Sequence, residues 1–426
     1  MIPGYTIVEE IFRGRKRIVY RGRREEGKRP VIIKTLADDF PTTSDLAGLK
    51  REYEIIKNLR IDGVTKALAL ERYPKGLALI LEDAGGEPLR NLLDSEKPLP
   101  RPPFVRKNAP AVDLVAFLET AAQIATAVAE LHHHHIIHKD INPKNIIVNL
   151  ETRKIELIDF SIASRLPRED QKISHPNLLE GTLAYISPEQ TGRMNRAIDY
   201  RTDFYSLGVT FYEMLTGQLP FYSTDPLELV HSHIAKTPQP PFEVNPEIPQ
   251  AVSEIVMKLL SKTAENRYSS GFGLKADLAF CLSQLRSKGR VDLFVPGQRE
   301  VSDKFNIPQK LYGREAEIKI LMTAFDRVCT GTIEMMRVSG YSGIGKTSLI
   351  HEIHKPILRQ KGYFISGKFD QLNRVVPYRQ RNHSGFSGTG PTVIDGERGR
   401  DPGLERKTVR SFGTQRPDYH RRNTGG

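Results

Sequence analysis

Residues 138–145, HKDINPKN, are the stretch that decides the fold of this chain. Taken alone, an octapeptide with Asn and Pro beside one Asp could be a surface turn. Three further stretches follow it in order: LIDFS at 157–161, SPE at 187–189 and DFYSLG at 203–208. Four spaced signals of this kind are hard to obtain by chance, so we interpret them together.

The octapeptide resembles the catalytic loop of protein kinases, H-R-D-L-x-x-x-N. In that family the Asp accepts the proton of the substrate hydroxyl and the Asn holds a metal ion. The resemblance implies that Asp140 is the catalytic base and that Asn145 is a Mg²⁺ ligand. Asp159 stands where the family has the metal-binding Asp of D-F-G, with Ser161 in place of the Gly. ATP and Mg²⁺ are the implied cofactors.

Ahead of this loop, short apolar runs resemble the strands of the family's small, strand-rich lobe, which we place at residues 5–83. Counted back from Val19 on the family motif G-x-G-x-x-G-x-V, the three glycine positions fall on Phe12, Gly14 and Arg17. Only Gly14 is a glycine. In the family, backbone N–H groups of this loop approach the ATP phosphates. Residues 12–19 match that glycine-rich loop only weakly.

Lys34 ends the apolar run VIIK and fits the lysine of V-A-I-K, which holds the α- and β-phosphates. The alternative is a surface lysine at the end of a strand. A helical stretch at residues 49–59 offers two glutamates for the ion pair that positions this lysine. Glu52 fits the family spacing better, and Glu54 is then a solvated residue.

The run LILED at 79–83 resembles the strand that leads into the hinge between the two lobes. The resemblance puts Leu81 at the back of the adenine pocket and gives the backbone contacts with the adenine edge to the stretch from Glu82 to Ala84. After the hinge the pattern turns helical. We place the large lobe at residues 84–285.

Within the large lobe, apolar and small residues recur at helical spacing over residues 114–131, which predicts a buried helix. Four histidines follow at 132–135. Consecutive residues point around a helix, so we interpret this run as a solvated helix end and not as a metal site. Asp203 resembles the residue that ties the catalytic-loop backbone to the lobe, and Arg267 resembles the buried partner of Glu189.

A second region begins after a stretch that mixes Gly, Pro and charge, which we interpret as a linker at 286–309. We place the region at residues 310–378. It opens with LYGRE and continues through a predicted strand, MMRVS at 335–339, into GYSGIGKT at 340–347. This octapeptide matches G-x-x-x-x-G-K-T in full, in the required position after a strand and at the start of a helix.

The region resembles the start of an AAA-like P-loop ATPase domain. The resemblance implies a second nucleotide site whose loop runs from Gly340 past Gly345. Backbone N–H groups of such a loop cradle phosphates. Lys346 would reach the phosphate oxygens, and Thr347 would bind Mg²⁺.

The ATPase domain does not finish in the usual way. Residues 379–426 are Gly, Arg, Ser, Thr and Pro with few apolar residues, so we expect a disordered basic tail. The run TVIDGE at 392–397 is the only candidate for the acidic strand that completes the metal site, and its two apolar residues are too few. The abrupt change near Tyr378 leads us to expect a frame-shifted product or a gene fragment.

The whole chain has 426 residues and a formal net charge of +12. Residues 379–426 carry nine Arg and one Lys against five acids, which is +5 of that charge, so basicity does not indicate a nucleic-acid partner. Cys281 and Cys329 form no disulfide framework and match no metal spacing, so we expect a reducing compartment and a cytoplasmic location. The N-terminus is no signal peptide, and we expect no membrane span.

The expected fold class is α+β: a bilobal, protein-kinase-like fold, followed by an incomplete α/β P-loop segment and the tail. The order of these parts resembles the N-terminal part of large signalling proteins that are common in cyanobacteria. Such proteins join a serine/threonine kinase domain to an AAA-like ATPase, usually with sensor and histidine-kinase modules beyond. Signalling partners that act through the ATPase segment are part of what the resemblance implies.

Two functions of different classes fit this pattern. The first is an active kinase that moves the ATP γ-phosphoryl group to a Ser or Thr hydroxyl of a protein substrate, with Asp140 as base and Lys34 and Glu52 as the phosphate-positioning pair. The second is a nucleotide-binding pseudokinase or scaffold that relays signals by docking. Asn142 stands where serine/threonine kinases place a lysine that steadies the γ-phosphate, and Lys139 replaces an arginine. The catalytic and metal-binding residues are all present, which favours the enzyme.

Overall fold

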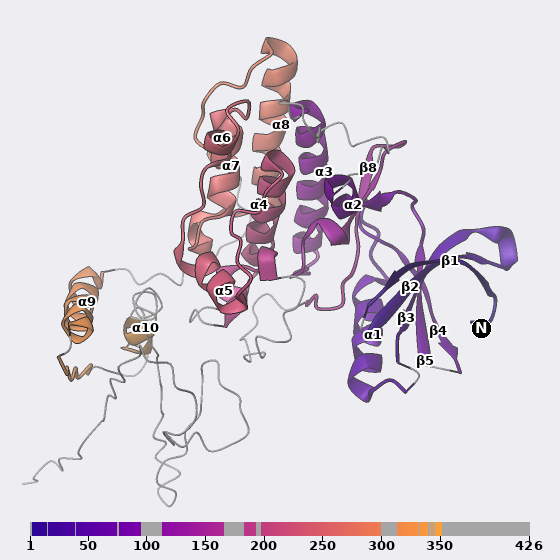
Figure 1. Ribbon diagram of the computed structural model, residues 1–426, viewed down its shortest axis with the longest axis horizontal. Helices are drawn as coiled ribbons and strands as arrows, with labels where there is room; N and C mark the ends of the chain where they lie inside the picture. The colour runs from indigo at the N-terminus through magenta and orange to yellow at the C-terminus, as the bar shows by residue number, and fades with distance from the viewer. Residues whose placement is uncertain are drawn as a thin grey trace, which may run out of the picture. The chain divides into compact units, whose positions relative to one another are not determined.

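The computed structural model describes residues 2–94 except 15, 39 and 75, then 113–165, 183–192 and 197–299, and farther along 313–351 except 331, 340, 342, 343 and 345. The chain divides into two compact units, whose described parts end at residue 299 and begin at residue 313. The first unit has a strand-rich lobe and a helical lobe, as the predicted α+β fold class requires (Figure 1).

A five-stranded antiparallel sheet forms the small lobe, in the spatial order β1-β2-β3-β5-β4 (Figure 1). One helix, α1 (Thr43–Ile56), packs against β4 and β5. It begins six residues before the predicted helix, because the Thr42 side chain caps it by accepting a hydrogen bond from the Asp45 N–H. The strands are β1 (Tyr5–Arg13), β2 (Arg17–Arg24), β3 (Pro30–Leu36), β4 (Ala67–Tyr73) and β5 (Gly76–Glu82).

Both faces of the sheet are buried at its centre, because apolar residues occupy consecutive positions in β5. Side chains alternate between the two faces of a strand. Ile80 packs with Ile33 in a small cluster on one face, whereas Leu79 and Leu81 belong to the main core together with Leu49 of α1. The face that carries Leu79 and Leu81 is the one that meets the functional residues.

The large lobe consists of helices and one small sheet of order β6-β7-β8. Its central helix is α4, in which every residue from Arg201 to Leu215 is buried. The elements are β6 (Glu87–Pro88), α2 (Leu89–Asp94), α3 (Leu114–His133), β7 (Ile146–Asn149), β8 (Lys154–Leu157), α4 (Arg201–Thr216), α5 (Pro226–Ala235), α6 (Pro241–Val244), α7 (Gln250–Leu259) and α8 (Gly271–Lys288), with short 3₁₀ turns at Pro143–Asn145, Leu183–Tyr185, Pro188–Thr191 and Ala264–Asn266.

The apolar helix α3 packs closely along α8 (Figure 1). At Gly271 a Cβ would lie only 2.7 Å from the Cβ of Ala129, so the first turn of α8 needs a glycine there. By length and composition α3 is also the one described helix that could cross a membrane, although no span was expected from the sequence. Core helices of water-exposed lobes pass the same test, and 56% of its apolar window is buried inside the protein.

The residues after α8 turn back onto the large lobe, although composition predicted a linker from residue 286. The guanidinium of Arg299 lies 3.6 Å from the ring centroid of Phe280 and 4.9 Å from that of Phe294. The buried carboxylate of Asp277 accepts a hydrogen bond from the Gly297 N–H at 2.7 Å. We call residues 291–299 the C-terminal strap. A cation over two rings holds it in place, and composition alone does not show such contacts.

The second unit contains two described helices, α9 (Glu315–Cys329) and α10 (Lys346–His351). The strand predicted at 335–339 is wrong, because residues 332–339 have no regular secondary structure. Ile333 and Met335 are 84% and 86% exposed. A strand needs a hydrogen-bonded neighbour, and the described residues of this unit provide none.

Candidate active site

Three charged side chains from three elements form one ion-paired cluster that joins the two lobes. Lys34 of β3 lies 2.8 Å from Glu52 of α1 and 2.8 Å from Asp159, which follows β8. The side chains of Lys34 and Glu52 are only 7% and 1% exposed. Buried charges are stable only when they are paired, so each of these groups holds the others in position.

The second glutamate of α1 lies outside this cluster. The Glu54 side chain is 60% exposed and pairs with Lys57 one turn later. Of the two glutamates that the sequence offered to Lys34, the structure brings Glu52 to it.

The strand register places three of the predicted nucleotide-binding residues on one face of the sheet. Val19 lies opposite Lys34 in the β2–β3 pairing, and Lys34 lies opposite Leu79 in the β3–β5 pairing. Directly opposed residues share a face, and so do alternate residues along one strand. Val19, Lys34 and Leu81 therefore share the face that carries the charged cluster.

Asp159 has a left-handed backbone conformation with φ of 61°, which costs a residue other than glycine about 1 kcal/mol or more. Ser161 has no positive φ, so the replacement of the D-F-G glycine brings no strain in this state. Phe160 is buried, and its N–H donates to Glu52 at 3.2 Å. Burial raises the pKa of Asp159, but Lys34 and Arg17 outweigh burial and hold that pKa below its usual range.

The catalytic-loop carboxylate, Asp140, is held by two amide side chains. Its two oxygens accept hydrogen bonds from Asn142 Nδ2 and Asn145 Nδ2, each at 2.9 Å. Burial is the main reason that the pKa of Asp140 rises to about 6, and the nearby negative charge of Asp159 adds to it. Asn145 Nδ2 also donates to the Asp140 carbonyl at 2.8 Å, which leaves the amide oxygen of Asn145 as its group for a metal.

Asn142 has a role that the sequence did not reveal. The sequence showed only that it replaces a lysine, whereas the structure shows a buried side chain that donates to Asp140 and accepts from the Lys144 N–H. At this position the loop therefore has, in place of a lysine, an amide that orients the Asp140 carboxylate. Lys144, the next basic residue, is exposed.

Asp203, at the start of α4, holds the backbone of the catalytic loop through two hydrogen bonds, as the sequence predicted. Its carboxylate accepts from the His138 N–H at 2.9 Å and from the Lys139 N–H at 2.7 Å. Lys139 has φ of 67°, so these bonds hold a left-handed residue in place. Burial raises the pKa of Asp203, but hydrogen bonding and charge from His132 outweigh it and lower that pKa.

The interpretation of residues 132–135 as a wholly solvated helix end is wrong for one of them. His132 is 5% exposed, and its Nε2 lies 2.8 Å from Asp203 Oδ2. His133, His134 and His135 are exposed. Because consecutive residues point around a helix, one of the four had to face the lobe, and the sequence alone did not show which.

A second buried ion pair lies between the residues that follow Asp159 and the large lobe. Arg267 makes two bonds to Glu189, at 2.6 Å and 2.9 Å, and both side chains are nearly fully buried. The Thr202 hydroxyl also donates to Glu189 at 2.8 Å. The predicted pairing of Glu189 with Arg267 is confirmed. Arg267 Nη1 also donates to the Arg201 carbonyl, so the pair ties Glu189 to the start of α4.

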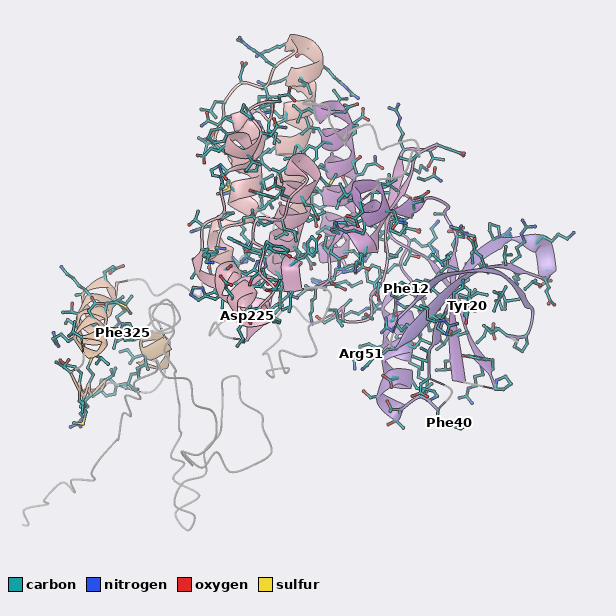
Figure 2. The ribbon with its side chains drawn as sticks, in the orientation of Figure 1. Phe12, Tyr20, Phe40, Arg51, Asp225 and Phe325 are labelled. Atoms are coloured by element: carbon teal, nitrogen blue, oxygen red, sulfur yellow. The ribbon has the colours of Figure 1, made fainter. Side chains whose placement is uncertain are left out.

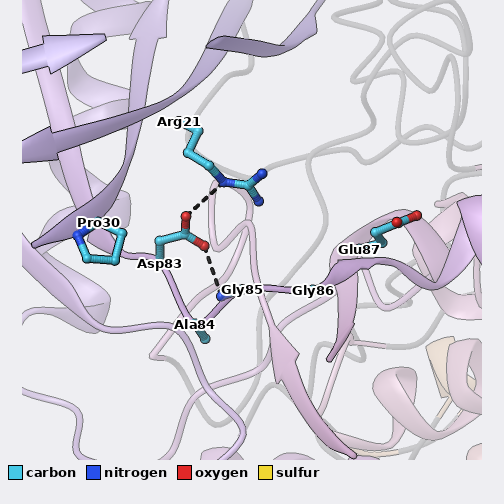
Figure 3. Close-up of a pocket in the computed structure, with 7 residues that line it drawn as sticks. All are labelled: Arg21, Pro30, Asp83, Ala84, Gly85, Gly86 and Glu87. Carbon is cyan, nitrogen blue, oxygen red and sulfur yellow. Dashed lines mark hydrogen bonds and ion pairs between the residues drawn. The ribbon is translucent and has the colours of Figure 1, made fainter. Parts of the chain in front are cut away.

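The hinge carries a cavity of about 570 Å³ beside the predicted adenine site (Figure 3). Asp83 shapes it by accepting from Arg21 Nε at 2.8 Å and from the Gly85 N–H at 2.9 Å. Of the predicted adenine-binding stretch from Glu82 to Ala84, Asp83 and Ala84 line the cavity. The lining residues are Arg21, Pro30, Asp83, Ala84, Gly85, Gly86 and Glu87.

The turn between β1 and β2 differs from a glycine loop in its described residues. The Gly14 N–H donates to the Arg17 carbonyl at 2.9 Å, and Phe12 is 56% exposed on the small-lobe sheet (Figure 2). Arg17 lies 3.1 Å from Asp159 and 3.6 Å from Glu52. The glycine motif showed Arg17 only as a missing glycine, and its place in the site comes from the structure.

The described part of the second unit holds two of the four predicted P-loop residues. Lys346 opens α10, as predicted, and its Nζ donates to the Tyr341 carbonyl at 2.7 Å. Thr347 is the second residue of that helix. Gly340 and Gly345 lie outside the described residues, as do residues 379–426.

The first site fits Mg²⁺ and the phosphates of ATP. Asp159 offers an ionised carboxylate and Asn145 an amide oxygen, which are the oxygen ligands that Mg²⁺ prefers, and Lys34 offers a cation. The described residues contain no cluster of three or more His, Cys, Asp and Glu side chains suited to a metal. Magnesium sites of this kind take their other ligands from phosphate oxygens and water.

A family model for the protein kinase domain matches residues 5–278, which is well over half of the chain. The chain belongs to the protein kinase domain family. Residues 310–390 match a model for an AAA ATPase domain, so the kinase domain is followed by the type of region that the P-loop predicted.

Curated relatives of this kinase domain come from several organisms. The chain is 32% identical to hybrid signal transduction histidine kinase G of Dictyostelium discoideum, over 68% of this chain and 11% of that protein. It is 29% identical to a probable serine/threonine-protein kinase of Clostridium perfringens, over 64% and 38% of the two chains. It is 30% identical to serine/threonine-protein kinase PknB of Mycolicibacterium smegmatis, over 47% and 29%. The chain thus spans between 11% and 38% of the length of these three proteins.

Proposed function

We propose that this chain is a serine/threonine protein kinase that moves the γ-phosphoryl group of ATP to a Ser or Thr hydroxyl of a protein substrate. The observation that carries the proposal is the 2.8 Å ion pair of Lys34 with Glu52, beside Asp159. Kinases work only when both this pair and the metal-binding Asp are in place. The names of the bacterial relatives support Ser and Thr as the acceptors.

In this proposal Asp140 takes the proton from the acceptor hydroxyl. A pKa of about 6 leaves it mostly ionised at pH 7 and still basic enough to accept a proton. Lys34 binds the phosphates, and Glu52 holds Lys34 in position. Asn145 and Asp159 are the Mg²⁺ ligands. ATP supplies the transferred group, and Mg²⁺ neutralises the charge that develops on it.

The remaining roles follow from the shared face of the sheet. Val19 and Leu81 enclose the adenine ring, and Gly14 lies beside the phosphates. The Glu82 N–H already donates to the Lys66 carbonyl, and the Ala84 carbonyl accepts from Asn149 Nδ2. The adenine edge would therefore use the other hinge groups, namely the Glu82 carbonyl and the Ala84 N–H.

We further propose that the kinase domain spans residues 5–285 and that residues 310–378 begin an ATPase domain with a second nucleotide site. Both sites use ATP, which fits a cytoplasmic location. Signalling partners would act through the second region. The second site would use the loop glycines, the phosphate-binding lysine and the Mg²⁺-binding threonine, namely Gly340, Gly345, Lys346 and Thr347.

The second candidate is a nucleotide-binding pseudokinase, and two observations favour it. Asn142 leaves the site without one cation, and the Asp159 carboxylate is already paired with Lys34 and Arg17. A pseudokinase would bind ATP and Mg²⁺ but transfer no phosphoryl group. The two candidates therefore differ in a single measurable step.

The deciding experiment is transfer of ³²P from labelled ATP to a generic Ser/Thr protein substrate, with and without Mg²⁺. We expect Mg²⁺-dependent transfer by the wild-type chain. Asp140→Asn should lose at least about a hundredfold in rate, because it removes the base, and should bind ATP nearly as the wild type does. ATP binding by the wild type without any transfer would support the pseudokinase instead.

A further inference from the structure

Arg17, the first residue of β2, reaches the same charged cluster as Lys34. Its guanidinium lies 3.1 Å from Asp159 Oδ1 and 3.6 Å from Glu52 Oε2. Alternate residues of a strand share a face, so Arg17 lies on the face of Val19, which is opposite Lys34. Two cations from neighbouring strands thus approach one carboxylate.

In the hairpin turn before Arg17, one backbone N–H is already hydrogen-bonded within the protein. A glycine loop binds phosphates through free backbone N–H groups. Here the N–H of Gly14 is used inside the hairpin, where it donates to the Arg17 carbonyl at 2.9 Å. A Cβ at Gly14 would lie 2.9 Å from the ring of the exposed Phe12, so a larger residue there would need that ring to shift. In this structure the Gly14 N–H is therefore not offered to a phosphate, and a side-chain donor of the same hairpin can take its place.

The site also has one positive charge fewer than the family pattern, so an additional cation would compensate for it. The catalytic loop has Asn142 where serine/threonine kinases have a lysine, so it lacks one positive charge near the phosphates. The Arg17 and Asp159 side chains are 25% and 30% exposed, so a phosphate or a metal ion from solvent can reach this pair. Glu52, in contrast, is 1% exposed and stays with Lys34.

We propose that Arg17 is a phosphate-binding residue, held by Asp159 and Glu52 in this structure and transferred to the phosphates of ATP when Mg²⁺ takes the Asp159 carboxylate. The inference rests on the proposed function in one respect, that the nucleotide site is the one formed by Lys34 and Asp159. A metal ion on Asp159 places positive charge beside the guanidinium and weakens that pair. Phosphate oxygens are then the matching anion, since guanidinium binds them with two parallel bonds.

The test is equilibrium binding of ATP and of adenosine, with Mg²⁺, to the full chain, measured by calorimetry. All proteins carry Lys346→Ala, so that the second nucleotide site does not contribute. The variants are Arg17→Ala and Arg17→Gln. Arg23→Ala is the matched control, because Arg23 is exposed on the same strand.

We expect both Arg17 variants to bind ATP about tenfold more weakly, the usual cost of a charged hydrogen bond, and to bind adenosine as the parent does. The Arg23 control should change neither affinity. ATP affinity within twofold of the parent would overturn the inference. So would an equal loss for ATP and adenosine, because that pattern shows a structural role. If Arg17→Ala does not fold, Arg17→Gln decides.

The outcomes also separate this inference from the kinase proposal. If the Arg17 variants lose ATP affinity while the parent transfers no phosphoryl group, the inference stands and the kinase proposal falls. If the parent transfers phosphoryl groups and the Arg17 variants bind ATP normally, the kinase proposal stands and the inference falls.

Discussion

The chemistry of Asp140 depends strongly on its surroundings. Its carboxylate is withdrawn from water, which raises its pKa to about 6, and two amides hold it in one orientation. A base acts only when it is deprotonated. The proposed reaction should therefore depend on pH in a range where ordinary aspartates do not titrate.

We expect kcat/KM for a peptide substrate to be constant above about pH 7 and to fall below about pH 6, by roughly tenfold per unit, as Asp140 takes up a proton. A pH–rate profile from pH 5 to pH 8 measures this. In Asn142→Ala the fall should begin at a higher pH, because the lost hydrogen bond favoured the ionised form. A rate that stays constant down to pH 5 would contradict the role of Asp140.

Lys34→Met should lower turnover by about a hundredfold or more, because positioning and charge neutralisation provide nearly all of the catalysis in phosphoryl transfer. Met keeps most of the side-chain volume and removes the charge. Lys66→Met is the control, since Lys66 is 44% exposed and pairs with Glu82 at the outside of the same lobe. Turnover within tenfold of the wild type in Lys34→Met would show that the small lobe has been assigned wrongly.

At the scale of elements, the catalytic loop takes its shape from the helices beneath it. The carboxylate of Asp203 holds two backbone N–H groups of the loop and the ring of His132, so α3, α4 and the loop meet at one buried group. Any change at Asp203 should therefore affect stability and activity together.

Asp203→Ala should lower the free energy of unfolding by about 3 kcal/mol at pH 7, as the loss of one partner from a buried charged network usually does. The lowered pKa of Asp203 means that its contribution is complete above its ordinary pKa and is lost as the pH falls below it. Urea unfolding measures the difference. Asp225→Ala removes an exposed helix cap and should cost only about 1 kcal/mol. Equal losses for the two variants would argue against the network.

How far the sequence predicted these elements depended on the kind of contact. Spacing within motifs was enough for the Glu189–Arg267 pair and for Asp203, because each is tied to one position in a motif. It was not enough for His132, since the rotation of a helix is set by the partner it packs against. Arg17 was missed for a related reason: its role depends on which face of β2 meets Lys34, and the motif showed only an absent glycine.

At the scale of the whole molecule, the part after α8 is the one that composition described least well. Residues rich in Gly, Pro and charge predicted a linker from 286, yet the C-terminal strap is fixed by Arg299 over two rings and by the buried Asp277. The opposite error occurred at 335–339, where order was predicted, as a strand, and no regular secondary structure is found. The apolar pattern is correct for a strand, but a strand forms only beside another.

Arg299→Ala should lower the thermal midpoint of the kinase domain by a few degrees, which corresponds to about 1 kcal/mol for a cation held over aromatic rings. Arg290→Ala is the control, because Arg290 is 79% exposed in the segment that joins α8 to the strap and pairs only with Asp292 among the described residues. Calorimetric scans of the two full-length variants make the comparison. Equal midpoints would show that Arg299 adds nothing to the stability of the lobe.

The bonds to Asp203 also set the order of events during synthesis. The His138 and Lys139 N–H groups bond to a carboxylate that lies 65 and 64 residues later in the chain. Contacts of such separation form late, because a long loop must close first. The catalytic loop leaves the ribosome well before α4 does. Until α4 is present, the carboxylate of Asp203 cannot hold Lys139 in its left-handed conformation. The proposed kinase would therefore stay inactive until its central helix has been made, and a half-made chain could not phosphorylate its neighbours.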